Sequence, residues 1–462
     1  MTSPVRTRAV AGRQWPVALL LGSGSFLVLF DSLAIATALP SIGTAFGLRP
    51  GVLQWVVSLN SVSIGAFLVL GGRVCDLVGR RRVLVASLAL CTVAGLVTGL
   101  APDLPVLLAG RVLQGIAAAF ALPAALSTAA TTFPDEPWRS RVFSVMAFAA
   151  WSAGLAGAML GGLITVHLSW RWVFLVTVPV GAVAVVAAAL RLPPDTPRQG
   201  TAERLDVWGA VLASTGLVVV ILGIQELGGG AGQGEAVLVV CVGLALLAGL
   251  VLVERRVPHP LVRPGLLRSR RMIGSCLAFG AFCAGYTAVI VIGSRYLQVV
   301  HGLSAVAAGL ALSPVLIGGI VSSLLAPLVL RRFTTRGVIT VCLVVCAAAL
   351  AMIAVRGHAG VAALLPWLLS WGIASGPIYV GFARECVGDT PEADRGTASA
   401  LYESMAHVGG AVAIAVDLTL IGAGLSYSAT ELVSVVVVAA GAVITFVLLP
   451  GAHGRRCTVQ CQ

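Results

Sequence analysis

Residues 15–40 read WPVALLLGSGSFLVLFDSLAIATALP, an apolar stretch that a single acid, Asp31, interrupts near its middle. An apolar run of about 20 residues is long enough to cross the hydrocarbon of a bilayer as a helix. A carboxylate at that depth costs about 2.5–3.5 kcal/mol and is kept mainly where it faces a water-filled path or a partner. The stretch therefore predicts a membrane helix with a functional acid. The alternative is a protonated acid that packs without a role.

The rest of the chain has the same character. Of its 462 residues, 58% are hydrophobic and 10% are charged, which is far from the composition of soluble domains. We therefore expect an all-α integral membrane protein with fourteen transmembrane helices and no sizeable soluble domain. The fourteen apolar stretches lie at 16–40, 53–71, 83–101, 104–128, 142–166, 172–192, 207–225, 236–253, 272–298, 304–329, 337–355, 360–383, 398–423 and 430–450.

The charges indicate how the helices are oriented. The chain has no Lys, and its thirty basic residues are all Arg, with a formal net charge of +12. If the N-terminus is cytoplasmic, all but five arginines fall in cytoplasmic segments, as the positive-inside rule requires. The five are Arg49, Arg111, Arg171, Arg295 and Arg356. We interpret the charge as topology rather than nucleic-acid binding, and expect both termini on the cytoplasmic side of a bacterial inner membrane.

Several function classes are disfavoured by what the sequence lacks. A Walker A loop needs a Lys for the phosphates, so we expect no use of ATP. The sequence has no zinc-ligand spacing and no Ser-His-Asp constellation, and we therefore expect neither an enzyme nor a cofactor.

Two parts of the chain match each other. Gly47-Leu48 corresponds to Gly302-Leu303, at an offset of 255 residues, and the loop at 132–139 resembles that at 389–395. Two parallel six-helix halves are a known transporter plan. We predict an N-terminal half at 1–192, a linker with two inserted transmembrane helices at 193–270, and a C-terminal half with a cytoplasmic tail at 271–462.

A basic loop joins the second and third predicted helices, and residues 72–82 read GRVCDLVGRRR. Gly72 and Gly79 permit a tight reversal, and Asp76 can accept hydrogen bonds from Arg80 or from a helix N-terminus. The loop resembles the G-x-x-x-D-x-x-G-R-R signature of the major facilitator superfamily, and a chance basic turn is the alternative. The resemblance implies a cytoplasmic gate at these four residues. We expect Asp76 to meet the start of the thirteenth helix, near 395–400.

The fourth predicted helix carries RVLQG at 111–115, which places Arg111 and Gln114 on one helical face. The segment resembles the R-x-x-Q-G motif of the superfamily's proton-coupled drug exporters. We expect Asp31 to approach Arg111 in at least one transport state. A structural arginine bonded to backbone carbonyls is the alternative.

Small residues recur every four positions in the fifth predicted helix, and such stripes allow close helix packing. The segment AGLAGAMLGG at 153–162 resembles the antiporter motif G-x-x-x-G-P-x-x-G-G, with Ala158 in place of proline. The resemblance assigns packing to Gly154, Gly157, Gly161 and Gly162, although generic helix packing explains the stripe too.

Residues 30–40 also resemble the L-D-x-T-V-x-N-V-A-L-P segment of the fourteen-span drug:proton antiporters. Asp31 and Ala38-Leu39-Pro40 match, whereas Leu33 and Ala36 stand where Thr and Asn are usual.

Further candidates lie in the second half and in the middle of other spans. Glu403, His407 and Asp417 follow one helical stripe, which we expect to face a central cavity. Glu403 and His407 could instead be solvated at the cytoplasmic mouth. The residues expected to line a pocket for flat, amphipathic molecules are Asn60, Trp151, Tyr286 and His407; aromatics near helix ends more often form an interfacial belt.

These features together predict an exporter that moves hydrophobic or cationic drugs or antibiotics outward in exchange for protons, by alternating access. Asp31 and Arg111 are the expected core pair, with Asp417 and Glu403 as secondary acids. Its partners would be a small amphipathic substrate, protons and the bilayer. The alternatives are a proton-coupled uptake symporter on the same fold and a non-transporting membrane sensor or scaffold.

Overall fold

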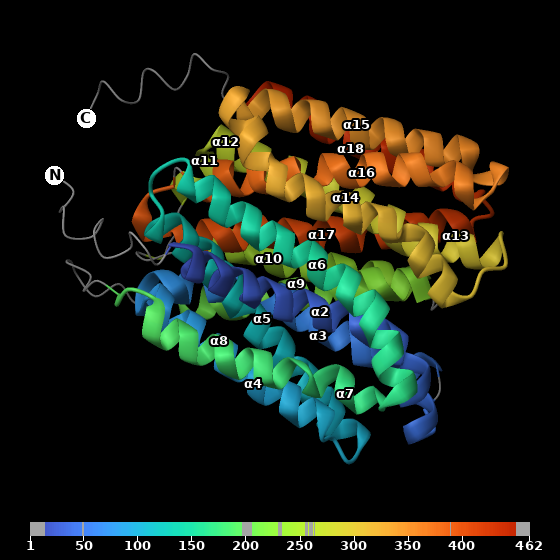
Figure 1. The fold of residues 1–462 in the computed structure, drawn as a ribbon, viewed down its shortest axis with the longest axis horizontal. Coiled ribbons are helices and arrows are strands. Elements are labelled where there is room, and N and C mark those ends of the chain that lie inside the picture. The colour runs from blue at the N-terminus through green and yellow to red at the C-terminus, as the bar shows by residue number, and fades with distance from the viewer. Residues whose placement is uncertain are drawn as a thin grey trace.

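The computed structural model of the chain is a bundle of long helices that run side by side (Figure 1). It describes residues 14–48, 50–195, 206–229, 233–254, 257, 262, 264–388 and 390–449, and these contain no strand. The tail after 449 lies outside the described residues, as do 196–205, 230–232, 255–256, 258–261 and 263 of the predicted linker. The helices are α2 (Gln14–Phe46), α3 (Pro50–Val78), α4 (Arg80–Gly99), α5 (Leu104–Thr132), α6 (Trp138–His167), α7 (Trp170–Leu175), α8 (Thr177–Arg191), α9 (Val207–Gly229), α10 (Gln233–Glu254), α11 (Pro264–Arg268), α12 (Arg270–Thr287), α13 (Gly293–Val299), α14 (Ala305–Arg332), α15 (Thr335–Arg356), α16 (Val361–Ala383), α17 (Arg395–Gly422) and α18 (Tyr427–Leu448).

Thirteen helical segments among the described residues are long and apolar enough to cross a membrane. The all-α expectation is therefore confirmed, but the count of fourteen is not. The difference lies at the predicted span 207–225, which falls on α9, because the described apolar run there, Trp208–Val220, is shorter than the others. One predicted span, 272–298, continues through a π-helical turn at Ala288–Ile292 between α12 and α13.

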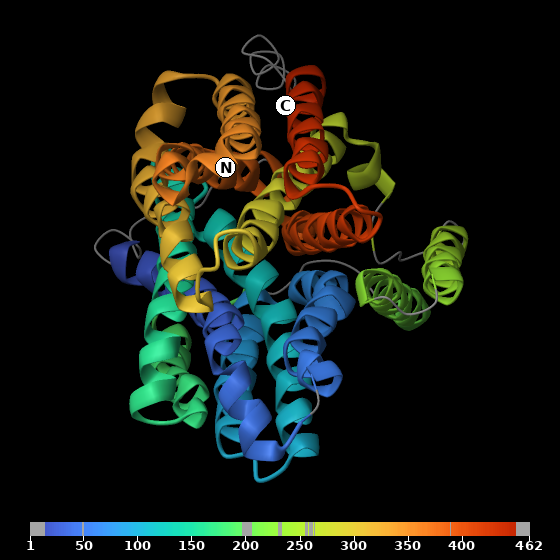
Figure 2. The ribbon, with the colours of Figure 1, turned by 90° about the vertical axis from the view of Figure 1, so that its right-hand side faces the viewer.

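The helices form two groups, which Figure 2 shows one above the other. The blue to green helices, α2–α8, make the lower group, and the yellow to red helices, α12–α18, make the upper one. The helix α9 packs against α3 of the first group and α17 of the second, and α10 packs against α9. The two inserted helices thus lie beside the junction of the two groups. The exact limits of the two halves remain a prediction.

The two glycines matched by the repeat share a backbone conformation. Gly47 follows α2 with φ 61°, and Gly302 precedes α14 with φ 66°. This left-handed region is open to glycine and strained for most other residues. The chain therefore turns at a glycine at the equivalent position of each half.

Close packing of α2 on α6 explains part of the small-residue stripe. A methyl group on Gly161 would lie 2.6 Å from Thr37 Oγ1 and 2.9 Å from the Ala34 backbone. Gly154 and Gly157 are buried as well. The packing role predicted for Gly162 needs correction, because a methyl group there would meet nothing within 4 Å. Gly161 faces α2, whereas the next residue, Gly162, points in another direction around the helix.

Four helix connections meet at one end of the bundle, which we call the arginine-rich end. They join α3 to α4, α5 to α6, α14 to α15 and α16 to α17. The end is defined by the arginines in and beside these connections: Arg80, Arg81, Arg82, Arg139, Arg141, Arg331, Arg332, Arg384 and Arg395.

Candidate functional site

Asp31, Arg111 and Gln114 form a buried polar network inside the first helix group. Arg111 Nη1 lies 2.5 Å from Asp31 Oδ2 and donates to Gln114 Oε1 at 2.9 Å. Gln114 Nε2 in turn donates to Asp31 Oδ1 at 3.2 Å. Both carboxylate oxygens therefore have a donor, as a buried charge requires. The structure brings together all three residues that the sequence selected from helices α2 and α5, and the contact is direct.

The arginine is held on further sides. Its Nε donates to the Val56 carbonyl of α3 at 2.7 Å, and its guanidinium lies 5.8 Å from the Phe174 ring centre. Only 1% of the Arg111 side chain is exposed, against 9% for Asp31. Arg111 therefore makes both of the contacts that its sequence context suggested, an ion pair with Asp31 and a hydrogen bond to a backbone carbonyl. Asp31 is the member of the pair that keeps some access to solvent.

The predicted gate motif joins the two helix groups at the arginine-rich end. Asp76 Oδ1 accepts from the Gly396 backbone N–H at 2.8 Å, and Oδ2 accepts from the Thr397 N–H at 2.8 Å and hydroxyl at 2.9 Å. A carboxylate at a helix N-terminus interacts favourably with the free N–H groups and the helix dipole. The expected contact of Asp76 with the start of the thirteenth helix is therefore present.

Glycine and arginine complete this contact. A methyl group on Gly72 would lie 2.5 Å from the Gly396 carbonyl oxygen, so α3 and α17 cross with their backbones almost touching. Arg80 forms an ion pair with Glu392 at 3.3 Å and lies 3.7 Å from Asp76. Gly79 has φ 114°, which favours glycine, and leads into α4.

Two more contacts tie the groups together at the same end. Arg384, which follows α16, lies 3.4 Å from Glu136, which precedes α6. Arg395 donates to the Ala130 carbonyl at 3.2 Å and to Thr131 Oγ1 at 3.4 Å, both on α5. With the Asp76 contacts, these interactions close the arginine-rich end of the junction.

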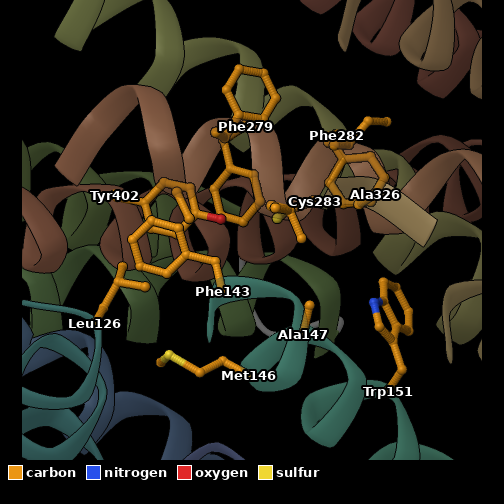
Figure 3. Packing of buried hydrophobic residues seen from close by; sticks show 14 of the residues in the cluster. Leu126, Phe143, Met146, Ala147, Trp151, Phe279, Phe282, Cys283, Ala326 and Tyr402 are labelled. Carbon is orange, nitrogen blue, oxygen red and sulfur yellow. The ribbon is translucent and has the colours of Figure 1, made fainter. Parts of the chain in front are cut away.

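An aromatic layer lies between the groups further along the bundle. Figure 3 shows Phe143 and Trp151 of α6 facing Phe282 and Cys283 of α12. The Trp151 ring meets the Tyr286 ring edge to face at 5.4 Å. Trp151 is buried, yet its indole N–H has no hydrogen-bond partner among the described residues. This layer therefore offers apolar surface together with an unused hydrogen-bond donor. Asn60 lies elsewhere, buried where α3 meets Gly115 of α5.

Glu403 lies near the aromatic layer, whereas the stripe expected on α17 does not stay together. Glu403 is buried and accepts from the Tyr379 hydroxyl at 3.3 Å, and His407 is half-buried. Asp417, 2% exposed, instead forms a hydrogen bond with Ser434 of α18. The expectation that one cavity takes all three side chains therefore needs correction, because α18 covers the far end of the stripe.

Sequence reasoning missed several buried acids, among them Glu431. It lies in the first turns of α18, is 4% exposed, and is close enough to Asp417 for their charges to repel. An acid inside the apolar stretch 430–450 was the signal that could have found it. The described residues contain no group of His, Cys, Asp and Glu that could hold a metal ion.

Comparison with known proteins places this geometry in a family. Residues 21–414 match the family model described as Major Facilitator Superfamily. The chain is 32% identical to the puromycin resistance protein pur8 of Streptomyces alboniger, over 92% of this chain and 86% of that protein. It is 35% identical to the cephamycin export protein CmcT of Amycolatopsis lactamdurans, over 88% and 85% respectively.

A solved structure shares the fold. The proton:xylose symporter XylE superposes with a TM-score of 0.70 at 16% identity, covering 95% of this chain and 96% of that one. The relatives are multi-pass membrane transporters rather than enzymes, and several are named for antibiotic resistance or export. The chain belongs to the Major Facilitator Superfamily.

Proposed function

We propose that this protein exports antibiotic-like, amphipathic molecules from a bacterial cell in exchange for protons. The single observation that carries the proposal is the buried Asp31–Arg111–Gln114 network. A carboxylate that is both buried and partly accessible can take up a proton, and its partner can respond to the change in charge. The names of the relatives support export and an antibiotic cargo.

Proton binding at Asp31 would act through Arg111. While Asp31 is ionised, the 2.5 Å ion pair and the Gln114 hydrogen bonds hold α2 and α5 together. A proton on Asp31 cancels its charge and leaves the guanidinium with Gln114 and the Val56 carbonyl as its hydrogen-bond acceptors. Arg111 would then favour an arrangement with new acceptors or water. In this way one proton biases the packing of the whole half.

The contacts at the arginine-rich end support alternating access. If this end faces the cytoplasm, as the distribution of arginines predicts, the structure corresponds to a state closed toward the cytoplasm. Opening it would separate Asp76 from the start of α17 and Arg384 from Glu136. Closing the opposite end would repay that loss, so that only one side is open at a time.

The aromatic layer and Glu403 indicate the kind of cargo. Trp151 and Tyr286 offer ring faces to flat molecules, and the free indole N–H suits a carbonyl or ether oxygen. Glu403 adds an acid that attracts cationic groups. These residues therefore support amphipathic cargo, neutral or cationic.

Transport into everted vesicles tests the proposal. We would first compare the antibiotic susceptibility of host cells with and without the protein, with a panel that includes puromycin and a cephamycin. Everted vesicles should then accumulate the active compound when a proton gradient is imposed, and lose it when the gradient is collapsed. Asp31→Asn should abolish this accumulation with normal amounts of protein in the membrane. Full accumulation in that variant would rule out the coupling role.

Uptake in the same direction as the proton is the second candidate. The fold is shared with a proton:xylose symporter, and the fold does not determine the direction of transport. Right-side-out vesicles distinguish the two, because a symporter accumulates its substrate when the outside is acidic, and an exporter does not.

A further inference from the structure

Trp151 crosses the junction between the two helix groups and is held there by the second group. Its helix, α6, belongs to the first group and packs against α14 of the second. The indole ring meets the Tyr286 ring of α12 edge to face at 5.4 Å, and only 8% of Trp151 is exposed. Two helices of the second group therefore fix the position of one side chain of the first.

The indole ring lies directly on the backbone of α14 at Gly319. A methyl group at Gly319 would come within 2.5–2.9 Å of three ring atoms of Trp151, which are Cδ2, Cε2 and Cε3. These atoms belong to the rigid fused part of the indole, so the whole ring would have to tilt or move to make room for a larger residue. The observed position of the ring therefore requires glycine at 319.

Two other glycines of α14 make different contacts. A methyl group on Gly318 would lie 2.8 Å from the Ile373 backbone nitrogen and 2.9 Å from the Gly372 backbone, both on α16. Gly318 therefore packs within the second group, whereas Gly319 faces the first. Gly309, earlier in the same helix, faces open space, because a methyl group there would meet nothing within 4 Å.

The Trp151 N–H indicates a ligand with a hydrogen-bond acceptor. This N–H is buried and has no partner among the described residues, although a buried indole N–H usually finds one. Trp371 also has an indole N–H without a partner, but it is 0% exposed and lies inside the second group, against Phe282 and Gly285. Figure 3 shows the Trp151 nitrogen on the side of the ring that faces Ala147, within the aromatic layer. A molecule in this layer can therefore accept the hydrogen bond.

We propose that Gly319 is a specificity-determining residue, which sets the direction of the Trp151 N–H for flat cargo that carries a carbonyl or ether oxygen. The inference rests on the proposed export function, because it requires that cargo enters the aromatic layer. A flat molecule gains contact with the rings whatever its polar groups, whereas the hydrogen bond needs the N–H in one direction. A residue larger than glycine at 319 tilts the ring, and this weakens the binding of cargo with an oxygen acceptor more than that of cargo without one.

Binding of two flat compounds to the purified protein tests this assignment without a proton gradient. Puromycin carries ether and carbonyl oxygens, whereas ethidium is a flat cation that has no oxygen atom. In equilibrium dialysis, Gly319→Ala should weaken puromycin binding by roughly 3- to 10-fold, the effect of one hydrogen bond, and ethidium binding by less than about 2-fold. Trp151→Phe, which keeps a ring but has no N–H, should give the same pattern. In that background Gly319→Ala should add little, because the fused ring atoms that it displaces are absent.

Two variants of the same helix serve as controls. Gly309→Ala should leave both affinities unchanged, because its methyl group meets open space. Gly318→Ala should lower the melting temperature of the protein through overpacking on α16, and leave the ratio of the two affinities unchanged. This second control separates a loss of stability from a loss of selectivity.

Three results would overturn the proposal. The first is an equal change in both affinities in Gly319→Ala, or no change in either. The second is an additive effect of Gly319→Ala and Trp151→Phe on puromycin binding, because independent sites add. The third is an absence of puromycin binding by the wild type. If Gly319→Ala does not fold, Trp151→Phe keeps the test valid, since an equal loss of both compounds in that variant contradicts the role of the N–H. Failure of proton-driven export would leave these affinities unchanged, so the two proposals fail separately.

Discussion

Away from the arginine-rich end, where Glu385 is paired with Arg271, the two halves treat their buried acids in opposite ways. In the first half, Asp31 is paired with Arg111 and each of its oxygens has a donor. In the second, no described cation pairs with Glu403, Asp417 or Glu431, and Asp417 keeps an unpaired oxygen. A proton that binds a paired acid neutralises it and frees its cationic partner. An unpaired buried acid, in contrast, is more stable with a proton bound. We propose from this comparison that the first half couples proton movement to transport, whereas the second half binds the cargo.

Removing the cation of the first half should have the largest effect. Arg111→Ala leaves Asp31 buried without its partner, and breaking a buried ion pair costs about 3–5 kcal/mol. We expect a marked fall in the thermal stability of the detergent-purified protein and loss of transport. Arg111→Lys should recover part of the stability only, because an ammonium cannot bond Asp31, Gln114 and the Val56 carbonyl in the same fork. Equal stability of the wild type and Arg111→Ala would mean that the pair does not hold the half together.

A smaller effect is expected where the halves meet. Asp76→Asn removes the charge that accepts three hydrogen bonds from α17, and such bonds contribute about 1.5–3 kcal/mol each. Because Asn keeps one acceptor oxygen, we expect a net loss comparable to one such bond, which shifts the equilibrium toward opening of the arginine-rich end by roughly 10- to 100-fold. Fluorescence between labels on the two sides of that end would measure the shift.

Asp195 offers a control for this experiment. It follows α8 and accepts from the backbone N–H groups of Arg81 and Arg82 at 3.0 and 3.2 Å, so it caps α4 of the first helix group. Asp195→Asn should therefore lower stability without changing the fluorescence between the halves. The same shift in both variants would show that general loosening, and not the Asp76 contact, moves the equilibrium.

The smallest expected effect is a difference in stability between substitutions at two neighbouring glycines of the first half. Gly161→Ala places a methyl group against α2 and should cost about 1–3 kcal/mol, as overpacking does. Gly162→Ala meets open space and should be neutral, or stabilising by about 0.5–1 kcal/mol through better helix propensity. Melting temperatures of the two variants check this. A penalty of similar size for both would mean that the stripe packs on more than one side.

The sequence predicted much of this arrangement because its signals are local. Apolar length identified nearly all the spans, and the spacing of Arg111 and Gln114 placed them on one face. The predicted contact of Asp76 with the start of α17 is present, because the free N–H groups of a helix N-terminus are natural donors to a carboxylate. The partners of Asp417 could not be read in the same way. A helical stripe tells which residues share a face, but not that α18 covers one end of it and provides Ser434 as a partner for Asp417.

Proton movement in liposomes that contain the purified protein tests the central claim most directly. A pH-sensitive dye inside the liposomes would follow protons when the cargo found in the vesicle assay is added outside. We expect cargo-dependent proton movement in the wild type and in Glu235→Gln, whose acid is exposed at the start of α10, and none in Asp31→Asn, although that variant still binds the cargo. Proton movement of normal size in Asp31→Asn would contradict the assignment of coupling to the first half.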